Sequence, residues 1–156
     1  IIFDITIIRL CDCIKGQFRK SQDICSEEEA VMDKLRIAVC DDEIVQQKLI
    51  QALLQKYLTE NNILAEVKFY TSGQEYLKEK KNEILETDIF LLDIFMPEMN
   101  GIDIGKELKN LGVQGKIIFI TGGNDYITEA FEIKAFSYIQ KPVEYEKFAK
   151  VMNFTE

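Results

Sequence analysis

Three aspartates stand directly after apolar runs of this sequence. Asp41 and Asp42 follow Leu35–Cys40, and Asp93 follows Ile89–Leu92. Short apolar runs of this kind fit the central strands of a sheet that is covered on both faces. The three carboxylates are therefore expected at the carboxyl ends of strands, where open α/β sheets bind their ligands. Carboxylates that share one site repel one another, and a divalent cation removes that repulsion.

Two further polar residues, Thr121 and Lys141, stand after later apolar runs and could act on a phosphate group. Mg²⁺ binds through one or two carboxylates and completes its shell with water and phosphate oxygens. A carboxylate is also a competent nucleophile toward phosphorus, which gives an aspartyl phosphate. Phosphoryl transfer depends mainly on positioning and charge neutralisation, which a cation, an ammonium and a hydroxyl supply. Each residue alone also fits a plain structural role, such as a helix start for the acidic pair. Their gathering at one edge of the sheet would be a far more specific sign of phosphoryl-transfer chemistry than any one of them alone.

The rest of the sequence supplies the elements that must position these residues. Runs typical of strands alternate with segments of helical periodicity. The predicted strands are 35–40, 65–70, 89–93, 116–121 and 136–140, and the predicted helices are 45–58, 73–83, 101–111, 126–133 and 144–152. Strict alternation predicts an α/β fold, a flavodoxin-like (βα)₅ doubly wound parallel sheet. The strand order 2-1-3-4-5 brings the ends of the first, third, fourth and fifth strands to one edge.

Composition and charge exclude several classes of function. The net charge of −8 leaves no electrostatic footprint for nucleic acid. The chain contains no histidine, so it has no Ser-His-Asp triad, and oxygen ligands favour Mg²⁺, Ca²⁺ or Mn²⁺. No apolar run approaches the roughly 20 residues that span a membrane. The four cysteines lack a disulfide framework, which predicts free thiols in a reducing cytoplasm: Cys11, Cys13, Cys25 and Cys40.

Residues 1–31 differ from the remainder, because they hold three of the four cysteines and lack the strand–helix alternation. Met32 stands just before the first predicted strand. The codons of Glu27–Glu29 must be purine-only, and they lie two codons before Met32, where a ribosome-binding site would be expected. We hypothesise that residues 1–31 are a translated leader or an artificial addition, and that residues 32–156 form the domain. A short added helix or strand packed on the domain is the alternative.

The motifs of residues 35–152 resemble those of response-regulator receiver domains from two-component signalling. They are Asp41-Asp42, Asp93-x-x-Met96-Pro97-x-Met99-x-Gly101, Thr121 and Lys141-Pro142. The resemblance implies that Asp93 accepts a phosphoryl group from a sensor histidine kinase. It implies that Asp42, Asp93 and the backbone carbonyl of Phe95 bind Mg²⁺, with Asp41 acting largely through water. It further implies that Thr121 and Lys141 bind the phosphoryl oxygens.

The resemblance also implies how the signal would leave the site. Thr121 would move toward the phosphoryl group and Tyr138 would turn inward, so that the surface of segments 126–133, 136–140 and 144–152 changes and could pair two copies. Candidates for this output face, which could equally fill the core, are Ile133, Phe136, Tyr145 and Phe148. The expected activity is self-phosphorylation with slow autodephosphorylation, not metabolic turnover.

The segment Tyr126–Pro142 resembles receivers of the LytTR class, which usually precede a DNA-binding domain that controls transcription. Two departures from the receiver pattern stand out. Gly122 occupies a position that is usually alanine, so the pair Gly122-Gly123 should loosen its loop. Phe95 is bulky beside Asp93, and we expect it to shield the acyl phosphate and slow its hydrolysis.

Three alternatives stay open at this point. The chain could be a stand-alone receiver, a degenerate receiver that serves only as a docking surface, or a Mg²⁺-dependent phosphohydrolase. The intact set of acidic residues, threonine and lysine weighs against a degenerate receiver. Such hydrolases commonly need a second aspartate two residues after the nucleophile, where this chain has Phe95.

Overall fold

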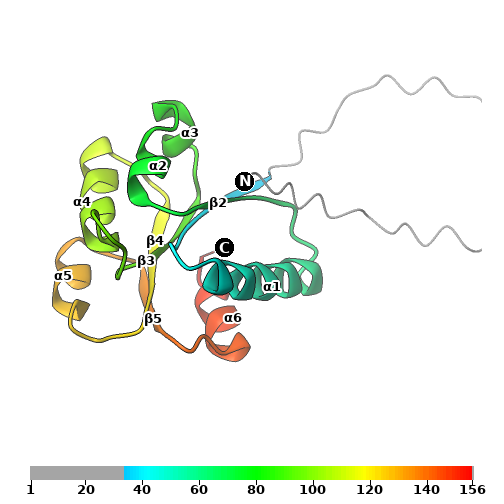
Figure 1. Ribbon diagram of the computed structural model, residues 1–156. Coiled ribbons are helices and arrows are strands. Elements are labelled where there is room, and N and C mark those ends of the chain that lie inside the picture. The colour runs from blue at the N-terminus through cyan, green and yellow to red at the C-terminus, as the bar shows by residue number, and fades with distance from the viewer. Residues whose placement is uncertain (1–33, 156) are drawn as a thin grey trace, which may run out of the picture.

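The computed structural model describes residues 34–155, and the expected leader, residues 1–31, lies outside them. Five parallel strands form one sheet in the order β2-β1-β3-β4-β5 (Figure 1). The strands are β1 (Leu35–Cys40), β2 (Ala65–Tyr70), β3 (Ile89–Asp93), β4 (Lys116–Thr121) and β5 (Ser137–Gln140). The predicted doubly wound fold and its strand order are confirmed.

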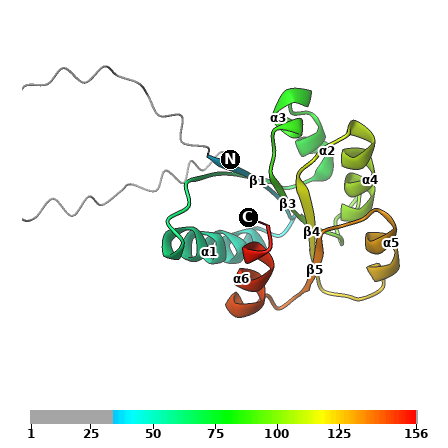
Figure 2. The same cartoon turned by 180° about the vertical axis from the view of Figure 1, so that it is seen from behind.

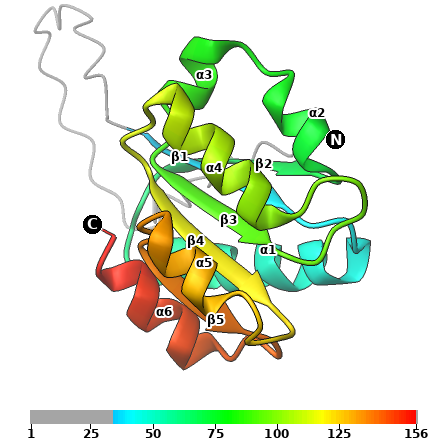
Figure 3. The same ribbon diagram turned by 90° about the vertical axis from the view of Figure 1, so that its left-hand side faces the viewer.

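Helices cover both faces of the sheet. One face carries α1 (Ile44–Glu60) and α6 (Tyr145–Asn153), which lie together in Figure 2. The other face, which Figure 3 shows toward the viewer, carries α2 (Gly73–Leu77), α3 (Lys81–Leu85), α4 (Gly101–Leu111) and α5 (Ile127–Glu132). Among the described residues, no helix is both long and apolar enough to cross a membrane.

The central strands are apolar at consecutive positions because alternate side chains enter two different cores. Val39 and Leu91 pack against α1 and α6, whereas Cys40 and Leu92 pack on the opposite face. All five residues of β3 are buried. This double burial explains why the strand sequences are continuous apolar runs that end abruptly on aspartates.

The helix predicted at residues 73–83 is wrong in one respect, because the structure divides this region into α2 and α3. Ser72 caps α2, since its hydroxyl accepts a hydrogen bond from the Glu75 N–H at 3.1 Å. Charged side chains of β1 and β2, among them Arg36, Glu66 and Lys68, line a surface pocket together with Glu79 and Glu83 of the α2–α3 region. Ile84 of α3 then packs into the core.

The structure also separates the apolar residues that enter the core from those that stay exposed. Helix α1 buries Ile50, Leu54, Tyr57 and Leu58, but Val45 on its periodic face is 75% exposed. Phe148, a candidate for the output face, is fully buried between α6 and the sheet. Ile133 and Tyr145 are partly buried, so only Phe136 of the four candidates is exposed.

Candidate functional site

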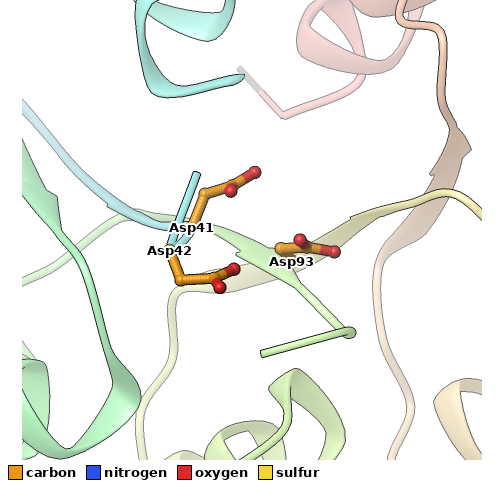
Figure 4. Close-up of side chains that lie close together, drawn as sticks. All are labelled: Asp41, Asp42 and Asp93. Carbon is orange, nitrogen blue, oxygen red and sulfur yellow. The ribbon is translucent and has the colours of Figure 1, made fainter. Parts of the chain in front are cut away.

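Three carboxylates converge at the carboxyl edge of the sheet (Figure 4). Asp41 and Asp42 follow β1, and Asp93 ends the neighbouring strand β3. One oxygen from each residue lies within 4.8 Å of the other two. Asp41 and Asp93 are almost completely buried, while Asp42 is partly exposed. The predicted gathering of these three acids is therefore present in the structure.

Lys141 directly follows β5, and its side chain reaches this acidic group. Its Nζ lies 3.1 Å from Asp41 Oδ2 and 3.0 Å from Asp93 Oδ2. The Lys141 N–H also donates to the Thr121 carbonyl at 2.8 Å, which fixes the lysine against the end of β4. Lys141 thus bridges two of the three carboxylates and leaves Asp42 without a cationic partner among the described residues.

The environment changes the ionisation of both partners in this bridge. Burial raises the pKa of the Asp93 carboxyl, and the charge of Asp41 adds to that effect, although the hydrogen bond and charge of Lys141 oppose it. Burial alone would lower the pKa of Lys141. The hydrogen bonds and charges of Asp93 and Asp41 outweigh it, so the pKa of Lys141 is raised and its ammonium stays protonated.

Two loops hold the acidic residues through backbone hydrogen bonds. The Asp41 carboxylate accepts from the Glu43 N–H at 2.9 Å, and the Asp93 carboxylate accepts from the Phe95 N–H at 3.2 Å. Gln47, which the sequence analysis missed, donates from Nε2 to the carbonyls of Asp41 at 2.7 Å and Tyr70 at 3.1 Å. A glutamine in the first turns of a helix is common, so its sequence position carried no signal.

Gly101 of the Met-Pro-x-Met-x-Gly motif allows α4 to begin directly against the end of β3. A Cβ at this position would lie 2.2 Å from the Asp93 carbonyl oxygen, which is a backbone atom. The Gly101 N–H donates to the Ile94 carbonyl at 3.0 Å, and the Asn100 side chain caps α4 by accepting from the Asp103 N–H at 2.9 Å. The motif thereby closes a tight loop around Asp93.

Thr121 and Tyr138 lie on the adjacent strands β4 and β5. Thr121 is fully buried. Burial raises the pKa of the Tyr138 hydroxyl and the charge of Asp125 adds to this, while the neighbouring Thr121 side chain opposes it. Tyr138 is partly buried and donates its hydroxyl hydrogen bond to the carbonyl of Gly123 in the β4–α5 loop. Phe95 lies two residues after Asp93 and turns its ring edge-on toward Tyr126, with 5.5 Å between the ring centroids.

The donor set fits a hard divalent cation. All three candidate ligands are carboxylate oxygens, and one of them, Asp42 Oδ1, is buried without a hydrogen-bond partner. Three carboxylates against one ammonium leave an excess of negative charge in a largely buried site. Oxygen-only ligands and uncompensated negative charge are the conditions under which proteins bind Mg²⁺.

A doubly wound parallel sheet with an acidic site at its carboxyl edge defines the class of protein. The chain belongs to the response regulator receiver domain family, whose model matches residues 37–153. It is 32% identical over 123 residues to the sensory transduction protein LytT of Oceanobacillus iheyensis, covering 77% of this chain and 47% of that protein. The chain therefore spans about half the length of this relative.

Two further relatives support the assignment. The chain is 31% identical over 115 residues to a protein-glutamate methylesterase/protein-glutamine glutaminase of Clostridium acetobutylicum, covering 71% of this chain and 32% of that protein. A crystal structure of a response regulator receiver domain protein from Clostridium thermocellum superimposes with a TM-score of 0.67 at 28% identity. That match covers 78% of this chain and 93% of the other.

Proposed function

We propose that this receiver domain accepts a phosphoryl group on Asp93 from the phosphohistidine of a sensor histidine kinase. The observation that carries the proposal is the bridge from Lys141 to Asp41 and Asp93, at 3.1 and 3.0 Å, beside the unpartnered Asp42 Oδ1. A buried nucleophile, a fixed ammonium and spare oxygen ligands together suit phosphoryl transfer, which depends on positioning and charge neutralisation.

In the proposed step, a carboxylate oxygen of Asp93 attacks phosphorus. The new P–O bond forms while the P–N bond to the donor histidine breaks, and the imidazole nitrogen keeps that electron pair. Lys141 holds one phosphoryl oxygen with its ammonium, which the neighbouring aspartates keep protonated. The buried Thr121 hydroxyl donates to another phosphoryl oxygen.

The residues that would hold Mg²⁺ are Asp41, Asp42, Asp93 and the backbone carbonyl of Phe95, with Asp41 acting largely through water. The bound ion would offset the repulsion between the carboxylates and the incoming phosphoryl group. Asp42 is suited to this role because its buried Oδ1 has neither a hydrogen-bond donor nor a cation beside it.

The phosphoryl group would bias a two-state switch through Thr121 and Tyr138. The surface that we expect to change lies on α5, β5 and α6, where the structure leaves Ile127, Phe131 and Phe136 exposed. Phe131 is 84% exposed, and aromatic residues are enriched in protein–protein interfaces. We propose that this surface pairs two phosphorylated copies and controls a DNA-binding domain that follows residue 156.

The domain would thus act as a cytoplasmic signalling module that regulates transcription. Its own chemistry would be limited to self-phosphorylation and slow autodephosphorylation, and this segment would not bind nucleic acid.

Dimerisation can be tested by sedimentation equilibrium with Mg²⁺ and acetyl phosphate. Phe131→Ser should abolish phosphorylation-dependent pairing. Val45→Ser, which changes an apolar residue of α1 that is 75% exposed, should not.

The central test is intact mass spectrometry after incubation with Mg²⁺ and acetyl phosphate. The parent should gain one phosphoryl group and Asp93→Asn should gain none. Asp88→Asn is the matched control, because Asp88 stands just before the opposite end of the same strand, where its carboxylate accepts a hydrogen bond from the Arg36 N–H at 2.8 Å. A parent that folds and binds Mg²⁺ but gains no phosphoryl group would reject this function and favour a docking module.

A further inference from the structure

Phe95 is a large aromatic residue that stays half exposed beside the proposed acceptor. It is 48% exposed, although Ile94 before it and Met96 after it are buried. Its N–H donates to the Asp93 carboxylate, and its ring meets Tyr126 edge-on at an interplanar angle of 71°. Phe95 therefore connects the backbone next to Asp93 with the β4–α5 loop.

The ring of Phe95 occupies the space that a side chain at position 123 would need. A Cβ on Gly123 would lie 3.2 Å from Phe95 Cε2 and 3.3 Å from Cζ, closer than ordinary van der Waals contact. Gly123 does not have a positive φ, so its backbone does not require glycine. The neighbouring Gly122 has open space around its would-be Cβ. A Cβ added at Gly123 would therefore crowd the Phe95 ring, whereas a Cβ added at Gly122 would not.

Gly123 also accepts the hydrogen bond from the Tyr138 hydroxyl. Tyr138 and Tyr126 both pack against the apolar core on the α2–α5 face of the sheet. A single residue of the loop thus contacts Phe95, which follows the acceptor, and binds Tyr138, which lies on the proposed output surface. Tyr126, the other partner of the Phe95 ring, stands at the N-cap position of α5.

We infer that Phe95 is a positioning residue that holds the β4–α5 loop so that Gly123 receives the Tyr138 hydrogen bond. A phosphoryl group on Asp93 would change the carboxylate that the Phe95 N–H now contacts, and the ring would carry this change to Gly123 and Tyr138. This coupling rests on the proposed phosphorylation of Asp93. The positioning role exists without phosphate and can be tested separately.

The first experiment records ring NMR signals of ¹³C-tyrosine-labelled protein without phosphate, with Tyr138 assigned by Tyr138→Phe. Phe95→Ala and Gly123→Ala should each shift the Tyr138 signal, and the control Gly122→Ala should leave it in place. The double variant should shift it no further than the larger single change, because both act through one contact. Unchanged signals of the buried Tyr57 and Tyr76 would verify that each variant folds. A parent-like Tyr138 signal in Phe95→Ala would overturn the inference.

The second experiment adds Mg²⁺ and acetyl phosphate and compares the parent with Phe95→Ala at equal phosphoryl content by mass. The equilibrium of the Tyr138 switch should respond about two- to tenfold less in the variant, the range expected for losing one aromatic pair. A full parental response in phosphorylated Phe95→Ala would refute the coupling. If neither protein gains a phosphoryl group, the proposed function fails, while the first experiment still decides the positioning role.

Discussion

Replacing Asp42 with asparagine should stabilise the metal-free protein, because it removes one charge from a crowded acidic site. The three candidate ligand oxygens lie within 4.8 Å of one another. Two unit charges at that separation repel by about 3.5 kcal/mol at an effective dielectric constant of about 20. Asp42 faces two such neighbours, and Lys141 offsets roughly one of them. Since Asp42 is partly exposed, we expect Asp42→Asn to raise the free energy of unfolding by about 1–2 kcal/mol.

Mg²⁺ should reverse the order of stability of the two proteins. A ligand that binds only the folded state stabilises it by about 2.7 kcal/mol at roughly 100 times its Kd. The parent should gain this stability, whereas Asp42→Asn should gain much less because it lacks a ligand carboxylate. Urea unfolding at neutral pH, first with EDTA and then with Mg²⁺, measures both effects.

The matched control is Glu43→Gln, which removes an exposed negative charge one residue further along the chain. This variant should change stability by less than about 0.5 kcal/mol in EDTA and should keep the response to Mg²⁺. The reasoning is refuted if Asp42→Asn is less stable than the parent in EDTA, or if Mg²⁺ stabilises both proteins equally.

Three further predictions concern the loops and the core. Gly101→Ala should lower the free energy of unfolding by roughly 1–3 kcal/mol, because its Cβ would meet the Asp93 carbonyl oxygen. Urea titration measures this change. The control Gly122→Ala, whose Cβ would lie in open space, should have little effect. Burial raises the pKa of the Cys40 thiol, and the charges of Glu75 and Asp41 add to this. Iodoacetamide should therefore label Cys40 at pH 8 only when urea unfolds the protein. Rapid labelling of Cys40 in the native protein, measured by peptide mass spectrometry, would contradict the burial argument. Phe95→Asn should shorten the lifetime of the aspartyl phosphate, because Phe95 shields it, and equal lifetimes of parent and variant would exclude that shielding.

The architecture was predictable because its signals are local. Central strands buried on both faces must be continuous apolar runs, and β3 shows this at all five positions. Two helix ends lie at residues that suit them, Ser72 as the cap of α2 and Gly112, at φ 84°, directly after α4. Strict alternation then left few topologies, since parallel crossovers are right-handed.

Helix breaks and the burial of single apolar residues could not be predicted from the sequence, because they depend on which other elements pack against them. The break between α2 and α3 had no clear signal in the helical pattern of residues 73–83, and the exposure of Val45 depends on how α1 lies on the sheet. The burial of Phe148 reflects the packing of α6 against the same core as α1. Periodicity identifies an apolar face but not whether a neighbouring element covers all of it.

By itself, the sequence determined the fold class and the candidate site residues, because each of these residues follows or ends a recognisable strand. They are Asp41, Asp42, Asp93, Thr121 and Lys141. Only the tertiary structure decided how these residues pair. It joined Lys141 to Asp41 and Asp93, left Asp42 Oδ1 unpartnered, and set the ring of Phe95 against Gly123. Such contacts join loops distant in sequence, and their geometry depends on the packing of the whole sheet.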